Sequence, residues 1–258
     1  MENVTQEPLR DSLVAGAASL GVPLDDRAVE RFEIYLRELV GWNQQHNLTA
    51  IRTPGEIITR HFLDSLSCVA AYDFTAGRPI IDIGAGAGFP GLPLKIAFPD
   101  LELVLIDASI KKVEFLRHLC PLLGFTQMDI VHVRAEELAH AGAYRQRFHL
   151  ALARAVAPLA VLAEYCLPFV TVGGYFIAQK NSGIDAEIAE AAPAIETLGG
   201  GRLDQIAVAV PGDPTPRALI RIRKENPTPS SYPRRPGMPA KRPLSASSRR
   251  RTHPKYKS

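Results

Sequence analysis

Hydrophobic residues recur at helical spacing along the first 77 residues, in segments that are otherwise rich in Arg and Glu. One such series lies on a single helical face and consists of Val29, Phe32, Leu36, Leu39 and Val40. A second helix is expected after Thr53, because this residue can cap it, Pro54 suits its first turn and Glu56 completes a capping box. Between the two helices, residues 42–51 are polar and predict a surface loop. Residues 1–77 are therefore predicted to form an N-terminal helical region.

Beyond this region the pattern changes to short apolar strands that alternate with helices. The expected strands are residues 80–83, 102–106, 130–133, 150–153 and 175–178. Strands and helices that alternate at this spacing predict a parallel, doubly wound sheet of the Rossmann-like kind. Two further strands, 203–210 and 218–223, are joined by the short turn 211–216, which predicts an antiparallel hairpin at one edge. The fold class is therefore α/β, with a mostly parallel sheet over residues 78–225.

The composition is that of an ordinary globular protein, since 46% of the 258 residues are hydrophobic. The longest apolar runs are strand-sized and fall short of the roughly 20 residues that a membrane-spanning helix needs. The N-terminus has no apolar core of a signal peptide. The three cysteines, Cys68, Cys120 and Cys166, are far apart and form no CxxC or Cys/His cluster. We therefore expect packed thiols, no bound metal and a cytoplasmic location.

Charge is distributed unevenly along the chain. Residues 226–258 contain nine Lys or Arg and no Asp or Glu, so that with a net charge of +3 residues 1–225 carry 3 − 9 = −6. The same segment holds seven prolines and almost no large apolar residues, and it is predicted to be a flexible tail that cannot fold alone. Its charge favours binding to a polyanion, while a solvated tail that only aids solubility explains the composition equally well.

Residues 82–88 (DIGAGAG) form a glycine-rich loop directly after the first expected strand. In a doubly wound sheet, ligands bind beyond the carboxyl ends of the strands. There, glycine lets the backbone approach the ligand and the next helix offers free N–H groups. The overlapping residues 86–91 match G-x-G-x-x-G, the fingerprint of dinucleotide-binding proteins, although a single match of this kind is weak evidence. The loop therefore predicts a nucleotide-like ligand and leaves its identity open.

Two features of the loop favour S-adenosylmethionine over NAD. Asp82 gives the pattern D-x-G-x-G-x-G, and its carboxylate suits a ligand with an ammonium group better than one with a pyrophosphate. Pro90 and Pro93 also remove N–H donors that a pyrophosphate would need at the helix start. Asp107, at the end of the second strand, is placed to accept from both ribose hydroxyls of either cofactor. We expect a class I S-adenosylmethionine-dependent methyltransferase fold, with a NAD-type oxidoreductase as the alternative.

Together these motifs resemble the bacterial glucose-inhibited division protein B family, also called ribosomal RNA small subunit methyltransferase G. The resemblance extends over residues 28–244, with the segments WNQQHNLTAIR (42–52), ITRHFLDSL (58–66), IDIGAGAGFPGLPL (81–94), LIDASIKKVEFLRHL (105–119), VRAEEL (133–138), ARAVAPL (153–159) and YPRRPGMPAKRPL (232–244). It implies an enzyme that uses S-adenosylmethionine to methylate N7 of one guanine, position 527 in the 530 loop of 16S ribosomal RNA. The small ribosomal subunit is then the partner, and we expect a monomer.

The resemblance also implies roles for individual residues. The expected cofactor-binding residues are Asp82, Gly84, Gly86, Gly88, Phe89, Asp107, Ala135, Glu136 and Arg154, the pair at 135–136 being where the adenine amino group is often read. Family positions implicated in catalysis correspond to Asn47, Arg134, Arg154 and Arg217. The expected RNA-binding residues are Arg134, Arg154, Arg217, Arg234, Arg235, Lys241 and Arg242. His61 and Asp64 lie in a family motif without an assigned role, and a structural hydrogen bond between helix and loop explains them equally well.

Methylation of guanine N7 agrees with the absence of other catalytic motifs. N7 has an exposed lone pair and no proton, so the transfer needs positioning and electrostatics rather than a general base. After the fourth strand there is no Asn/Asp-Pro-Pro-Tyr motif for amino-group methylation and no cysteine nucleophile. Our hypothesis is that Arg154 binds guanine O6 or an adjacent phosphate; the alternative is that it only pairs with a carboxylate of the pocket. A non-catalytic RNA-binding or ribosome-assembly protein on the same fold is a further alternative.

Overall fold

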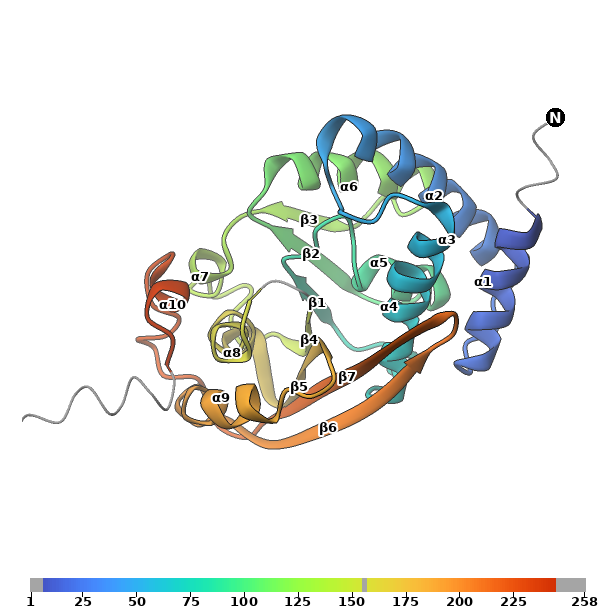
Figure 1. The fold of residues 1–258 in the computed structure, drawn as a ribbon. Coiled ribbons are helices and arrows are strands. Elements are labelled where there is room, and N and C mark those ends of the chain that lie inside the picture. The colour runs from blue at the N-terminus through green and yellow to red at the C-terminus, as the bar shows by residue number, and fades with distance from the viewer. Residues whose placement is uncertain (1–6, 155–156, 245–258) are drawn as a thin grey trace, which may run out of the picture.

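The computed structural model describes residues 7–154 and 157–244, and its centre is one seven-stranded sheet (Figure 1). The strands are β1 (Ile80–Ile83), β2 (Leu103–Asp107), β3 (Asp129–His132), β4 (Phe148–Arg154), β5 (Val170–Asn181), β6 (Gly200–Val210) and β7 (Asp213–Lys224). Their order in the sheet is β3-β2-β1-β4-β5-β7-β6. Strands β1 to β5 are parallel, and β7 runs antiparallel to both β5 and β6. The predicted mostly parallel sheet with an antiparallel hairpin at one edge is confirmed.

Helices cover both faces of this sheet (Figure 1). The first face carries α1 (Glu7–Ser19), α2 (Asp26–His46), α3 (Pro54–Ile57), the π-helix η1 (Ile58–Leu63), α4 (Asp64–Leu66), α5 (Gly91–Ala97) and α6 (Ile110–Leu122). The second face carries α7 (Ala135–Leu138), α8 (Leu159–Cys166) and α9 (Asp185–Thr197). Short 3-10 turns lie at η2 (Ser67–Ala70), η3 (Phe74–Ala76) and η4 (Leu167–Phe169), and α10 (Met238–Lys241) follows the last strand. Within the described ranges, no helix is long and apolar enough to cross a membrane.

Alternation along the strands gives the sheet two hydrophobic cores. On β1, Ile80 packs with the N-terminal helices, whereas Ile81 and Ile83 pack with the core under α7, α8 and α9. Since successive side chains of a strand point to opposite faces, Asp82 lies on the same face as Ile80. Phe32 and its helical neighbours belong to this first core. The N-terminal helices are therefore packed as part of the sheet's first layer.

The order of the strands places the functional region between β1 and β4. The chain leaves β1 for β2 on one side and leaves β4 for β5 on the other, so the carboxyl ends of β1 and β4 flank the topological switch point. A crevice for ligands forms at such a point in doubly wound sheets. Gly84 follows β1 directly and Arg154 is the last residue of β4. The fold thus brings the glycine loop and Arg154, which are far apart in sequence, to the same edge of the sheet.

The polar segment 42–51 is only partly a loop, contrary to the prediction. Helix α2 continues through Trp42, and Asn47 ends it with a left-handed φ of 48°. The helix extends because Trp42 packs against an aromatic ring of α6 and because Asn43 is buried. The Asn43 side chain donates to the Thr49 carbonyl oxygen (3.0 Å) and accepts from the Thr49 N–H (2.9 Å). The polar character of a segment does not reveal whether an Asn side chain in it is buried and bonds to the backbone or faces solvent.

The turn between the last two strands is shorter than the predicted residues 211–216. Strand β7 already begins at Asp213, so that Pro214 and Pro216 lie within it. The pairing of β7 with β5 stops at Arg217. The two prolines lie beyond that residue, where the strand has at most one neighbour, and the missing N–H costs little there.

Residues 226–244, the described part of the predicted tail, are packed against the protein. Thr228, Pro233 and Pro239 are buried, and Figure 1 shows the segment with α10 beside α7 and α8. The prediction of a flexible tail is therefore wrong for these residues. The partners that hold the segment come from distant helices, and composition does not reveal them. Residues 245–258, the rest of the predicted tail, lie outside the described residues.

Candidate functional site

Two connected cavities lie at the carboxyl ends of β1, β2 and β3. The glycine-loop cavity has about 380 Å³ and is lined by Leu48, Thr49, His61, Gly84, Ala85, Gly86, Ala87, Phe89, Asp107, Ala108, Lys112 and Arg154. The α7 cavity has about 230 Å³ and is lined by Ile83, Gly84, Ile106, Asp107, Ala108, Val133, Arg134, Ala135, Glu136, Ala157, Tyr165 and Ala240. Both cavities include Gly84, Asp107 and Ala108. They therefore form one cleft, which has the size of a small-molecule site.

Asp107 is held in a fixed orientation at the junction of these cavities. Its Oδ2 accepts from the Gly86 N–H (2.9 Å) and its Oδ1 accepts from the Ser109 N–H (2.8 Å). Each carboxylate oxygen keeps further lone-pair capacity, so the group is preorganised to accept hydroxyl donors. Gly86 has a φ of +63°, and an added Cβ there would lie 3.9 Å from the nearest atoms, the Gly84 carbonyl oxygen and Lys112 Nζ. The backbone at this glycine is therefore open to a ligand.

Asp82 and Gly88, two predicted cofactor-binding residues, line neither cavity. Asp82 is fully buried, its Oδ2 accepts from the Gly91 N–H (2.7 Å), and burial raises its pKa to about 7. Gly88 has a φ of +108°, and a Cβ there would lie 2.6 Å from the Tyr35 hydroxyl oxygen and 3.1 Å from a Leu116 methyl. Both residues therefore shape the loop from behind. Among the described residues, Asp82 Oδ1 has no hydrogen-bond partner, which a ligand's ammonium group or its water would satisfy.

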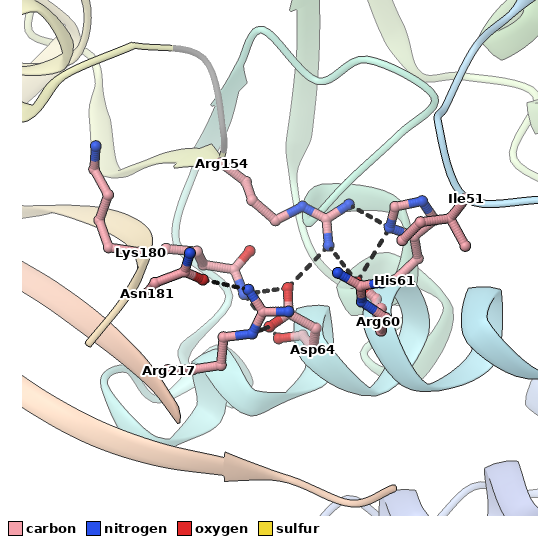
Figure 2. A pocket seen from close by; sticks show the side chains of 9 residues that line it. Ile51, Arg60, His61, Asp64, Arg154, Lys180, Asn181 and Arg217 are labelled. Carbon is pink, nitrogen blue, oxygen red and sulfur yellow. Dashed lines mark hydrogen bonds and ion pairs between the residues drawn. The ribbon is translucent and has the colours of Figure 1, made fainter. Parts of the chain in front are cut away.

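A third cavity, the arginine cavity, adjoins the glycine-loop cavity (Figure 2). It has about 330 Å³ and is lined by Ile51, Arg60, His61, Asp64, Arg154, Gln179, Lys180, Asn181 and Arg217. His61 and Arg154 line both cavities and thus stand at the boundary between them. The lining of the arginine cavity holds four cationic side chains and one carboxylate, that of Asp64. An anionic or oxygen-rich ligand suits this lining.

Arg154 is fixed by four contacts, so that its guanidinium has little freedom. Its Nη1 donates to Asp64 Oδ2 (3.0 Å) and to the Arg60 carbonyl oxygen (3.2 Å), and its Nη2 donates to His61 Nδ1 (3.0 Å). The guanidinium carbon lies 4.7 Å from the centroid of the Phe89 ring, within the range of a cation–π contact. The carboxylate pairing that we considered as the alternative for this arginine is therefore present.

Nδ1 of His61 lies 3.0 Å from Arg154 Nη2 and 3.1 Å from the Arg60 carbonyl oxygen. Because an arginine can only donate, we assign Nδ1 as the acceptor from Arg154 and Nε2 as the donor to Thr49 Oγ1 (2.8 Å). The ring stacks on Phe89 with 4.4 Å between centroids. Burial, followed by the charge of Arg154, lowers the His61 pKa to about 3. The structural hydrogen bond between helix and loop that we considered for His61 is thus observed, and it connects the loop at Thr49 to Arg154.

Asp64 joins two arginines that come from different strands (Figure 2). Its Oδ2 accepts from Arg154, and its Oδ1 lies 3.7 Å from Arg217 Nε. The side-chain amide of Gln179 donates to the Asp64 backbone carbonyl oxygen (2.7 Å). Arg217 also pairs with Asp213 (2.9 Å). The motif RHxxDS therefore supplies the acidic centre of a charged network.

The other predicted site residues lie apart from this network. Asn47 is exposed and lines none of the three cavities; its Oδ1 accepts from Arg52 (3.2 Å). Arg134 is exposed at the edge of the α7 cavity. Arg234 is paired with the buried carboxylate of Glu164 (2.7 Å) and so serves the packing of the tail. Further exposed basic residues of this segment are Arg235, Lys241 and Arg242.

Several residues of the arginine cavity and the glycine-loop cavity were missed by the sequence analysis. Gln179, Lys180 and Asn181 are the last residues of β5, and the rule that places sites at the carboxyl ends of parallel strands would have identified them. Arg60 and Thr49 have no such signal, because their place depends on the packing of the N-terminal helices. Lys112 lines the glycine-loop cavity, 3.9 Å from Asp107 Oδ2. Within the described ranges, no group of three His, Cys, Asp or Glu is placed to hold a metal ion.

Comparison with known sequences gives a specific match. Residues 28–209, more than half of the chain, match the family model described as rRNA small subunit methyltransferase G. The ribosomal RNA small subunit methyltransferase G of Alkaliphilus oremlandii is 44% identical over 236 residues, which covers 92% of this chain and 99% of that protein. The protein of the same name from Roseiflexus castenholzii is 46% identical over 234 residues, covering 91% of this chain and 99% of that protein.

Solved structures with low sequence identity share the fold. Cofactor-bound Rv0187 from MTB has a TM-score of 0.53 and 18% identity, covering 78% of this chain and 92% of that chain. A predicted O-methyltransferase, Atu636 from Agrobacterium tumefaciens, has a TM-score of 0.50 and 21% identity, covering 64% of this chain and 80% of that chain. At these identities the likeness concerns the fold alone, and it confirms the predicted methyltransferase-type α/β architecture.

Proposed function

Because the chain belongs to the rRNA small subunit methyltransferase G family, we propose that it methylates N7 of a guanine in the 530 loop of 16S ribosomal RNA. The family is one of S-adenosylmethionine-dependent methyltransferases that act on small-subunit ribosomal RNA. The proposal includes the target atom N7, the 530 loop, a cytoplasmic location and a monomeric state. A NAD-type oxidoreductase is no longer a candidate, since the curated relatives are named as methyltransferases.

The cleft at the glycine loop fits S-adenosylmethionine. Asp107 offers a preorganised acceptor for the ribose hydroxyls, and Gly84 and Gly86 let the backbone approach the ligand. The buried and unpaired Asp82 Oδ1 suits a cationic amino group behind the loop, and Glu136 lines the α7 cavity, where the adenine would lie. When bound, this cofactor supplies an electrophilic methyl group on a sulfonium ion.

The position of Arg154 is the observation that carries the proposal. It stands at the boundary between the cofactor cleft and the arginine cavity, with a guanidinium held by Asp64, His61 and Phe89. A fixed guanidinium presents two parallel N–H donors, which suit guanine O6 or a phosphate. A base held by its O6 in the arginine cavity would direct its neighbouring N7 toward the boundary between the cavities.

The charges around this boundary suit transfer to N7. The attack by N7 needs no proton acceptor, and His61 is neutral with Nδ1 engaged by Arg154, so it neither removes a proton nor repels a sulfonium ion. During the transfer the positive charge moves onto the guanine ring. Asp64 supplies the one carboxylate in the described lining of the arginine cavity, and its negative charge would offset the positive charge that arrives there.

The remaining cations of the arginine cavity are candidates for the RNA backbone. Arg60 and Arg217 line the arginine cavity on the side of Asp64 (Figure 2), whereas the Lys180 ammonium group is paired with Glu187 (2.6 Å). Arg217 lines this cavity, and its guanidinium is oriented by Asp64 and Asp213. Exposed Arg134 lies at the opposite end of the cleft. RNA held from both sides would be positioned by its phosphates, while the base contacts select guanine.

Mass spectrometry of 16S ribosomal RNA from cells that lack this protein tests the proposal. We expect 7-methylguanosine to be absent from the 530 loop, to return when the chain is expressed and to stay absent with the Arg154→Ala variant. The proposal is overturned if the 530 loop keeps its 7-methylguanosine in cells without the protein, or if another nucleotide loses its methyl group instead.

A further inference from the structure

Residues 225–244, which we call the C-terminal strap, run from the end of β7 to the mouth of the α7 cavity. Figure 1 shows the strap crossing the outer side of α8 and ending with α10 beside α7. The family model ends at residue 209, so the strap lies outside it. The strap carries much of the basic charge that suggested RNA binding, but its contacts are with the cofactor side of the protein.

The beginning of the strap is anchored at a buried lysine. Lys224 is fully buried, and its ammonium group donates to the carbonyl oxygens of Leu167 (3.0 Å) and Leu198 (2.6 Å) and to the Thr228 hydroxyl. The N–H groups of Glu225 and Asn226 both donate to the Gly199 carbonyl oxygen (2.9 Å each). Since a buried ammonium group needs such acceptors, Thr228 ties the beginning of the strap to the buried end of β7.

The middle of the strap is held by one arginine. The Arg145 guanidinium donates to the carbonyl oxygens of Thr228 (2.9 Å), Pro229 (3.1 Å) and Tyr232 (2.9 Å). His140 Nε2 lies 2.8 Å from the Pro233 carbonyl oxygen. The donors are side chains and the acceptors are strap carbonyls, so these contacts fix the path of the backbone without depending on the strap's side chains.

The last part of the strap reaches the cofactor cleft. Arg234 forms a bidentate pair with Glu164, whose side chain is fully buried. Three residues further on, the Gly237 N–H donates to Glu136 Oε1 (2.9 Å). Ala240, on α10, then lines the α7 cavity together with Glu136. The strap therefore holds a predicted cofactor-binding side chain and also forms part of the cavity wall.

We propose that the C-terminal strap is a wall of the adenine pocket and determines both the affinity and the adenine selectivity of the cofactor site. This inference rests on the proposed function, because it takes the α7 cavity as the place of the adenine. Glu136 is buried, and one of its oxygens is occupied by the strap, so its orientation toward the adenine amino group depends on the strap. A substituent on that amino group would run into α10.

Binding of S-adenosylhomocysteine to the protein, measured by calorimetry in the absence of RNA, tests the inference. A chain that stops after Leu244 keeps the strap and should bind with an unchanged Kd. A chain that stops after Glu225 should bind at least tenfold more weakly. It should also discriminate less against S-adenosylhomocysteine that carries a benzyl group on adenine N6. The Kd of this analogue divided by the Kd of S-adenosylhomocysteine should fall at least tenfold relative to the full chain.

A point variant covers the case in which the shortened chain does not fold, since removal of the strap leaves Glu164 unpaired. Ala240→Trp adds an indole at the mouth of the α7 cavity and leaves every anchor of the strap in place. It should weaken S-adenosylhomocysteine binding at least tenfold at an unchanged Tm. Ser231→Trp is the matched control, because Ser231 is an exposed strap residue that does not line the cavity, and its Kd should stay within twofold.

Equal affinities for Ala240→Trp and Ser231→Trp would overturn the inference, as would an unchanged ratio of Kd values in a folded chain that stops after Glu225. Either result leaves the proposed target untouched, since no RNA is present in the measurement. Failure of the full chain to bind S-adenosylhomocysteine would instead overturn the proposed function.

Discussion

The cofactor cleft and the arginine cavity meet at Arg154, yet they are built in different ways. The cleft is built around the glycine loop, of which residues 83–87 and Phe89 line it, and around Asp107, whose carboxylate is oriented by two N–H groups. The arginine cavity is formed by charged side chains from the η1–α4 segment and from β4, β5 and β7. The cofactor cleft depends on glycines and close packing. The arginine cavity depends on ion pairs between side chains from distant segments.

This difference predicts different weaknesses. Added atoms should damage the cleft, because its glycines leave room only where a ligand or a neighbouring side chain already fits. Lost charges should damage the arginine cavity, because the ion pairs of Asp64 are largely shielded from water and leave an unpaired partner when they are broken. The following variants separate the two cases.

The largest effect is expected for Arg154→Ala, which touches both regions. Turnover on the ribosomal substrate should fall by about 10² to 10³, the usual cost of removing one preorganised donor. S-adenosylhomocysteine binding should change much less, because the cleft keeps its backbone. Arg154→Lys is the control: it keeps the charge but loses the planar fork, and it should recover only a minor part of the activity. Undiminished turnover with Arg154→Ala would falsify the proposed role.

A steric change behind the glycine loop is expected to have the next largest effect. Gly88→Ala places a Cβ against the Tyr35 hydroxyl and requires a φ of +108°, so the free energy of unfolding should fall by about 3 kcal/mol. Gly86→Ala is the matched control, since its Cβ would point into open space; it should cost roughly 1 kcal/mol in stability and act mainly on cofactor affinity. Urea denaturation and calorimetry measure the two quantities. Equal losses of stability would contradict this division between the two glycines.

Removal of one charge tests the arginine cavity. Asp64→Asn keeps the shape but loses the carboxylate that pairs with Arg154 and faces Arg217, and kcat should fall about thirtyfold, or about 2 kcal/mol. Asp213→Asn is the control, because Asp213 pairs with Arg217 and Arg60 but not with Arg154; its kcat should change less than threefold. If the two variants lose activity equally, the pairing of Asp64 with Arg154 has no special role in the reaction.

The same contrast explains how far the sequence could predict the structure. The mostly parallel sheet and the antiparallel edge hairpin follow from patterns within short segments, and these predictions are confirmed. The motif predicts that Asp82 and Gly88 bind the cofactor, but it gives only their order along the chain, and both lie behind the loop without lining either cavity. A strand pattern determines only on which face of the sheet a residue lies. Whether the residue contacts the ligand or the helix that packs behind the loop depends on the packing of that helix.

The arginine cavity and the strap depend on contacts between distant segments. Asp64 meets Arg154 and Arg217 only after the N-terminal helices dock on the sheet, and residues 225–244 are held by Arg145 and Glu164. The strap is basic and proline-rich in composition, and the same composition is typical of a flexible segment. A buried carboxylate such as Glu164 looks like any other Glu in the sequence, so the docking partner has no local signature.

The smallest predicted effect concerns His61, which couples the two regions through Thr49 and Arg154. Its folded-state pKa of about 3 lies below the ordinary value of 6.5, so the unfolded chain takes up the proton first and stability falls as the pH drops from about 6.5 toward 3. Between pH 6.5 and 5.5 this one group should cost roughly 1 kcal/mol. His61→Gln keeps hydrogen-bonding capacity without a titrating ring, and its free energy of unfolding should fall less over the same interval. Urea denaturation measures the free energy of unfolding of both proteins at the two pH values. The change with pH in the His61→Gln variant is then subtracted from that in the original protein, so that the contribution of the other titrating groups cancels. A difference of zero would mean that His61 has the same pKa in the folded protein as in the unfolded chain, and the burial and the Arg154 contact that we assign to it would then be wrong.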